Sequence, residues 1–197
     1  MSDHTGYRKK GAMESIYNYL DVTPYWIQPA ALERRFVLHS GEHELGQLEF
    51  HSAWGSLALA ECAQGRWSFK RVGFLNPRVT VRLPDTESDL GLYTPRWTGT
   101  QGRLDLANGH AYVWQAANFW ASQFCWRHPS GDDLVLFSPG SEEQKLSNLF
   151  KQQARVTFAS AAQNLGDLPL LVLLGWYLMI LQYDDAAAAA AATAAAA

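Results

Sequence analysis

The feature that most limits how this chain can fold is its last apolar segment, Leu168 to Tyr183, which reads LPLLVLLGWYLMILQY. Pro169 fits the first turn of a helix, where its missing amide hydrogen costs nothing. A helix with no polar face has to be buried on all sides, either in protein or in lipid. The rest of the chain must therefore supply an enclosure for this segment, or the segment must enter a membrane.

The length of the segment favours burial in protein. Sixteen helical residues span roughly 24 Å, whereas the hydrocarbon core of a bilayer is ~30 Å thick and usually needs about 20 residues. No Lys or Arg follows Arg155, so the basic flank that commonly accompanies a membrane anchor is missing. A core helix is the favoured interpretation, and a tail-anchored membrane protein with a cytosolic β-domain is the alternative.

Before this segment the apolar residues recur with a period of two, which is typical of strands. Turn-forming groups separate the runs, and Asn108-Gly109 is the sharpest hairpin signal. The stretch from Glu142 to Gln153 predicts a short helix or a crossover loop. Eleven strands are predicted, with a further one near Tyr25 to Gln28: Arg35 to His39, Leu45 to Ser52, Leu57 to Cys62, Arg66 to Val72, Arg78 to Leu83, Leu90 to Trp97, Gly102 to Leu106, His110 to Gln115, Phe119 to His128, Leu134 to Ser138 and Arg155 to Phe158.

These strands and the apolar helix together predict one architecture. A sandwich has sheets only about 10 Å apart and cannot hold a helix that is itself roughly 10 to 12 Å wide. A closed antiparallel barrel of about 12 strands can hold it, so the chain is expected to be mainly β with a hydrophobic C-terminal helix at its centre. We expect an N-terminal segment at 1–33, the barrel at 34–183 with its central helix at 168–183, and an Ala-rich tail at 184–197 that extends the helix as a frayed end.

Composition narrows the classes of function. The chain has 16 Lys plus Arg against 19 Asp plus Glu, a formal net charge of -3, which disfavours nucleic-acid binding. No signal peptide is predicted in the first 30 residues, so the protein is expected to be cytoplasmic, with Cys62 and Cys125 reduced and buried. No nucleophile elbow, phosphate-binding loop or dinucleotide-binding turn is found, so a non-enzymatic protein without a cofactor or metal is predicted.

The combination of a strand-rich region from Arg34 to Phe158 and an apolar helix from Leu168 to Tyr183 resembles the tubby-like superfamily. That superfamily includes tubby C-terminal domains, phospholipid scramblases and LURP-one-related proteins. The resemblance implies a barrel of about twelve strands around the helix. It also implies a binding or scaffold module, since the members that bind phosphoinositides do so through basic side chains on the barrel exterior.

Two predicted strands carry basic residues on their outward face. Alternation places Trp67 and Phe69 on one face of their strand and Val79, Val81 and Leu83 inward on the next. The cations on the opposite face could hold an anionic phospholipid headgroup and so associate the protein with a membrane. An ordinary solvated face, or the binding of a protein partner, explains the same pattern. The candidates are Arg66, Lys70, Arg78 and Arg82.

Two weaker patterns suggest other kinds of site. His39, His43 and His51 have matching parity and could share a face as zinc ligands, although solvated histidines in a hairpin are the favoured interpretation. Trp114, Trp120 and Trp126 could form an aromatic platform for a sugar or a lipid. They are more simply explained as part of the barrel wall and core.

Overall fold

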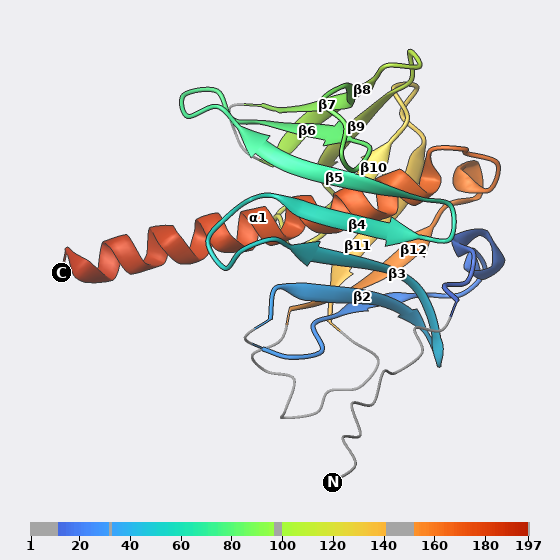
Figure 1. The fold of residues 1–197 in the computed structure, drawn as a ribbon, viewed down its shortest axis with the longest axis horizontal. Helices are drawn as coiled ribbons and strands as arrows, with labels where there is room; N and C mark the ends of the chain where they lie inside the picture. Colours follow the sequence, from blue (N-terminus) through green and yellow to red (C-terminus); the bar gives the residue numbers. More distant parts are fainter. Residues whose placement is uncertain (1–11, 32, 97–99, 141–151, 197) are drawn as a thin grey trace, which may run out of the picture.

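The structure is a computed structural model, which describes residues 12–31, 33–96, 100–140 and 152–196. These residues form a closed antiparallel barrel around one long helix (Figure 1). The strands are β1 Tyr25–Ile27, β2 Arg35–Ser40, β3 His43–Phe50, β4 Ala58–Cys62, β5 Gly65–Val72, β6 Arg78–Arg82, β7 Asp89–Pro95, β8 Gln101–Leu106, β9 Ala111–Ala116, β10 Phe124–Arg127, β11 Asp133–Pro139 and β12 Gln153–Phe158. The helices are α1 Leu168–Ala195 and the short 3₁₀ helices η1 Ile16–Tyr19 and η3 Ser160–Ala162.

Each strand pairs with the next one in the chain, and the pairing of β1 with β12 closes the barrel. The prediction of a mainly β, closed barrel of about 12 strands around a hydrophobic C-terminal helix is therefore confirmed. Since β1 pairs with β2 and β12, and Ile16 is buried in the core, the barrel begins earlier than residue 34. Most of the predicted strands agree with the structure to within two residues.

The strand predicted from Phe119 to His128 is much shorter in the structure. Only Phe124–Arg127 is extended and paired, as β10. The side chain of Asn118 accepts hydrogen bonds from the backbone N–H groups of Ser122 and Gln123, at 2.9 and 3.2 Å, which turns the chain before the strand starts. The expected helix or loop at Glu142 to Gln153 lies almost wholly outside the described residues, and its last residue begins β12.

The first half of α1 is the core of the barrel, since Leu168 to Leu181 are all buried. Trp176 stacks on Trp26 of β1, with ring centroids 5.8 Å apart. Trp126 of β10 donates a hydrogen bond from Nε1 to the carbonyl oxygen of Leu171, at 2.8 Å. Inward side chains from strands on different sides of the barrel thus meet the helix, as its apolar surface on every side requires.

The second half of α1 leaves the barrel. The helix continues through Ala195 with exposed alanines, so the predicted tail is a regular extension of the helix rather than a frayed one (Figure 1). By length and composition α1 could cross a membrane, but 67% of its most apolar 18-residue window is buried inside the protein.

Because the strands alternate in direction, the connections fall into two groups. The start end of the barrel, where α1 begins, carries the loops β2–β3, β4–β5, β6–β7, β8–β9 and β10–β11. The exit end, where α1 leaves, carries the loops β1–β2, β3–β4, β5–β6, β7–β8 and β9–β10. Contacts of the helix fix this assignment, because Asp167 bonds to His110 and Tyr112 at the start end and Asp185 bonds to Arg71 at the exit end.

Candidate functional site

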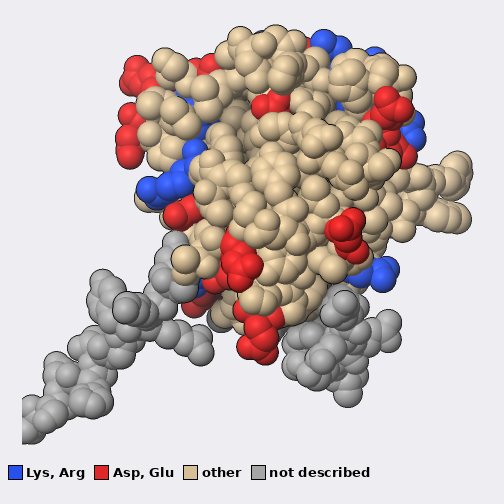
Figure 2. All heavy atoms as spheres, turned by 90° about the vertical axis from the view of Figure 1, so that its right-hand side faces the viewer, with Lys and Arg blue, Asp and Glu red and all other residues tan. Residues whose placement is uncertain are grey.

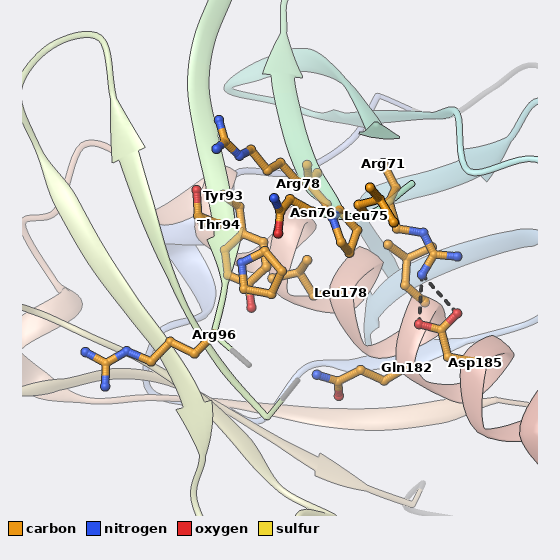
Figure 3. Close-up of a pocket in the computed structure, with 14 residues that line it drawn as sticks. Arg71, Leu75, Asn76, Arg78, Tyr93, Thr94, Arg96, Leu178, Gln182 and Asp185 are labelled. Carbon is orange, nitrogen blue, oxygen red and sulfur yellow. Dashed lines mark hydrogen bonds and ion pairs between the residues drawn. The ribbon is translucent and has the colours of Figure 1, made fainter. Parts of the chain in front are cut away.

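A cavity of about 660 Å³ opens at the exit end, between α1, the β5–β6 loop and the end of β7 (Figure 3). Its volume lies within the range of small-molecule sites, about 300–1,000 Å³. The floor is apolar and is built by Val79, Tyr93, Leu178 and Leu181. Burial raises the pKa of the Tyr93 phenol, so this side chain stays neutral.

The rim of the cavity is predominantly cationic. Arg71, Arg78 and Arg96 line it, and Asp185 is the acidic residue among the lining side chains. Arg71 donates from Nη1 to both carboxylate oxygens of Asp185, at 2.9 and 2.7 Å. In Figure 3 the guanidinium groups of Arg78 and Arg96 extend away from Asp185, and neither forms an ion pair with a described residue. The rim therefore carries two positive charges that its own acidic residue does not neutralise.

Strand alternation explains how Arg71 reaches this cavity. Arg71 lies two residues after Phe69, which is buried in the core, so both side chains belong to the inward face of β5. Its register partner is Val79, another inward residue. An inward cation is tolerated here because β5 ends one residue later, at the open end of the barrel. Neither Arg71 nor Arg96 was predicted from the sequence to belong to a site; the parity of Arg71 with Phe69 was the available signal for the first of them.

The four predicted anion-binding residues, Arg66, Lys70, Arg78 and Arg82, lie on the outer side of β5 and β6 but do not form one compact site. Arg66 pairs with Glu61 at 3.9 Å, and Arg82 pairs with Asp89 at 2.5 Å. Lys70 and Arg78 form no ion pair with a described residue. Arg78 is opposite Val72 in the register, six residues along β5 from Arg66, which is roughly 20 Å. Only Arg78 lines the exit-end cavity.

One prediction for β6 is wrong. Leu83, expected to face inward, lies beyond the end of the strand and is 46% exposed. The register between Val81 and Arg82 shifts at this point, so the alternation that places Val79 and Val81 inward does not continue to Leu83.

Arg34 connects three parts of the exit end. Its Nη1 donates to the carbonyl oxygens of Ala53 and Gly55 in the β3–β4 loop, each at 3.0 Å. Its Nη2 donates to Asp184 of α1, and its guanidinium carbon lies 3.9 Å from the centre of the Phe50 ring. Burial raises the pKa of Asp184, and Arg34 opposes that effect. Arg34 therefore fixes both the exit of the helix and the β3–β4 loop.

Arg34→Ala is expected to lower the free energy of unfolding by about 1–3 kcal/mol, because two carbonyl groups and a half-buried carboxylate lose a charged donor. Urea unfolding of the variant measures this loss. The matched control is Arg103→Ala, which removes an exposed Arg103–Asp105 ion pair and is expected to cost less than about 1 kcal/mol. Equal losses in the two variants would show that Arg34 has no connecting role.

The zinc hypothesis is wrong. His43 begins β3 and His51 follows its last residue, so the strand separates them by roughly 27 Å. His43 instead contacts Glu14 through Nδ1 at 2.5 Å, and His39 stacks on Tyr25 with centroids 6.2 Å apart. Within the described ranges, no group of three or more His, Cys, Asp or Glu side chains could hold a metal ion.

The tryptophan prediction holds for two of the three residues. Trp114 and Trp126 are fully buried in the core, as expected. Trp120 is 81% exposed, because it lies in the β9–β10 loop that replaces the first half of the predicted strand. Cys62 and Cys125 are buried free thiols, as predicted.

The fold and the cavity define a class: a closed antiparallel barrel with a helix as its core and an arginine-lined cavity where that helix leaves. Comparison with known proteins gave no match for this chain, whether against protein-family models, curated proteins or solved structures.

Proposed function

We propose that this protein is a non-enzymatic binding module for anionic phospholipid headgroups, and that it is a member of the tubby-like superfamily. The observation that carries the proposal is the exit-end cavity, which combines an arginine rim with an apolar floor. Guanidinium groups bind phosphate through paired, charge-assisted hydrogen bonds. A phospholipid headgroup presents a phosphate next to apolar glycerol and acyl carbons, and so matches both parts of this cavity.

The proposed site differs from the wall of β5 and β6 suggested by the sequence. On the wall, Glu61 and Asp89 already pair with Arg66 and Arg82, so that of these cations Lys70 alone lacks a described acidic partner, whereas at the cavity Arg78 and Arg96 both lack one. Leu178 and Leu181 of α1 form part of the floor, so the site exists only while the helix lies in the barrel. A bound headgroup would therefore stabilise the folded protein. A cytoplasmic location with reversible membrane association follows from this proposal.

The test compares two charge-matched double variants. Arg78→Gln/Arg96→Gln is expected to weaken binding to vesicles that contain phosphatidylserine or a phosphoinositide by about 30-fold, since each cation near an anionic surface contributes about 1 kcal/mol. Arg66→Gln/Arg82→Gln, on the wall, is expected to bind as the wild type does. Vesicle co-sedimentation measures both, and thermal unfolding recorded alongside shows that both variants are folded.

Two results would contradict the proposal. Loss of binding only in the wall variant would place the headgroup on β5 and β6, as the sequence first suggested. Absence of binding by the wild type, both to anionic vesicles and to a soluble inositol phosphate, would show that the protein does not recognise phospholipid headgroups at all.

A further inference from the structure

Three loops at the exit end expose large apolar side chains almost completely. The exposed fractions are 99% for Trp54 in the β3–β4 loop, 98% and 86% for Phe74 and Leu75 in the β5–β6 loop, and 92% and 81% for Phe119 and Trp120 in the β9–β10 loop. We call these five residues the apolar tips. Single exposed apolar residues are common, but aromatic residues exposed on three loops of the same barrel end indicate a surface that binds a partner.

Local hydrogen bonds hold two of these loops so that their tips point outward. The carbonyl groups on either side of Trp54, those of Ala53 and Gly55, both accept from Arg34, and the backbone N–H of Gly55 donates to Ser52 Oγ at 2.9 Å. In the β9–β10 loop Asn118 accepts from two backbone N–H groups, and the rings of Phe119 and Trp120 meet edge to face at 5.3 Å. The tips are therefore presented by ordered turns.

The third loop, β5–β6, joins the tips to the cavity. Gly73 adopts φ +86, a conformation that favours glycine, and turns the chain toward Phe74. Leu75, Asn76 and Pro77 of the same loop line the cavity next to Arg71 and Arg78. An apolar contact made by this loop would thus occur directly beside the guanidinium groups.

The two ends of the barrel differ in charge. The described start-end connections between β2 and α1 contain no Lys or Arg, and their acidic residues are Glu42, Asp85, Glu87, Asp132 and Asp167. Figure 2, which looks onto the start end, shows Asp and Glu side chains spread over it and Lys and Arg at the edges of the view. The exit end carries Arg34, Arg71, Arg78 and Arg96 against Glu33, Asp184 and Asp185, and Arg78 and Arg96 pair with no described acidic residue. An anionic surface would therefore attract the exit end and repel the start end.

The exposed part of α1 projects from the same end as the tips (Figure 1). From Ala186 to Ala195 it contains only alanine and Thr193, and it extends roughly 15 Å, about half the thickness of a bilayer's hydrocarbon core. The last charged residues before it, Asp184 and Asp185, pair with Arg34 and Arg71. A bilayer against the exit end would thus meet paired charges at headgroup depth and an uncharged helix beyond them.

We propose that the exit end is a membrane-docking surface, on which the apolar tips enter the headgroup–acyl boundary of an anionic bilayer and the alanine part of α1 enters the same leaflet. Trp favours this boundary, since its ring leaves water while its indole N–H stays hydrated, and Phe and Leu bury apolar area there. A bilayer fits better than a protein partner because the tips are distributed over separate loops beside a projecting helix. That the bilayer is anionic rests on the function proposed above, whereas the contact between the apolar tips and the bilayer does not depend on that function.

The experiment measures the partition of the full chain onto vesicles of phosphatidylcholine alone and of phosphatidylcholine with phosphatidylserine. The variant Trp54→Ala/Phe74→Ala/Trp120→Ala is expected to lose about a hundredfold in binding to the anionic vesicles, because three aromatic rings no longer leave water. The control, Val22→Ala/Leu83→Ala, removes exposed apolar side chains that lie away from the exit end and is expected to bind as the wild type does. Brominated acyl chains should quench the tryptophan fluorescence of the wild type more than that of the triple variant.

A soluble inositol phosphate separates this inference from the proposed function. A triple variant that still binds the inositol phosphate but has lost vesicle binding supports docking by the tips. Wild-type binding to both kinds of vesicle that depends on the tips but not on Arg78 and Arg96 would also support docking by the tips, while contradicting the headgroup site. Unchanged vesicle binding by the triple variant, or a wild type that ignores vesicles and uses the tips to bind a protein, would overturn the docking surface.

Discussion

A chain truncated after Phe158 is expected to be unfolded or aggregated, whereas the full chain is expected to be soluble without detergent. The truncation removes α1, whose residues Leu168 to Leu181 are buried and include twelve large apolar side chains. Burial of each contributes about 1.5–3 kcal/mol, so their loss exceeds the ~5–15 kcal/mol by which a domain is stable. Solubility and thermal unfolding of the two chains measure the difference.

The opposite outcome of this experiment has a definite meaning. If the truncated chain folds well and only the full chain requires detergent, α1 is a membrane anchor and the protein is the tail-anchored alternative considered from its sequence. The barrel would then need another way to fill the space that Trp26, Trp126 and Phe137 now share with the helix.

Gly175→Ala is expected to destabilise the protein by about 2–3 kcal/mol, although alanine is the better helix former by about 1 kcal/mol. A Cβ at this position would lie 2.4 Å from Phe137 Cζ and 2.9 Å from Trp126 Nε1. Phe137 is fully buried, and Trp126 is held by its hydrogen bond to Leu171, so neither ring can move aside without cost. Urea unfolding measures the loss, and Gly175→Leu is expected to prevent folding.

The control for this substitution is Gly166→Ala. Nothing lies within 4 Å of a Cβ built on Gly166, and its φ is not positive. This variant is expected to be neutral or up to about 1 kcal/mol more stable, since alanine restricts the unfolded chain. A stabilising effect of Gly175→Ala would show that α1 packs less closely against β10 and β11 than the structure indicates.

The architecture could be predicted from the sequence because two independent constraints agree. A helix that is apolar on every side needs an enclosure, and a run of short alternating strands joined by turns provides one of the right size. The strand at Phe119 to His128 was predicted too long because alternation of apolar residues does not reveal a side-chain cap. Asn118 decides that the chain turns, and its two hydrogen bonds are visible only in the structure.

The candidate site was harder to predict, for a different reason. Alternation reports which face of a strand a residue occupies, but not how far along the barrel its neighbours lie or which acidic residue pairs with it. Of the four cations predicted to share one surface, Arg78 lines the cavity, yet Arg66 is roughly 20 Å away along the strand direction. Arg96 follows β7, which is separated from β5 by β6, so only the pairing of these three strands and the position of α1 show that it lines the same cavity as Arg71.

The position of α1 in the chain has a consequence for how this protein is made. A ribosome synthesises all twelve strands before it adds the helix around which they close. In addition, β1 cannot complete its pairing until β12 has been synthesised. Until the helix has been synthesised, the apolar inward faces of the strands have nothing to pack against. Chains with exposed apolar surface and unpaired strand edges are prone to aggregate. We therefore expect the nascent chain to need the protection of a chaperone, and the barrel to close in a single late step once the helix has been synthesised.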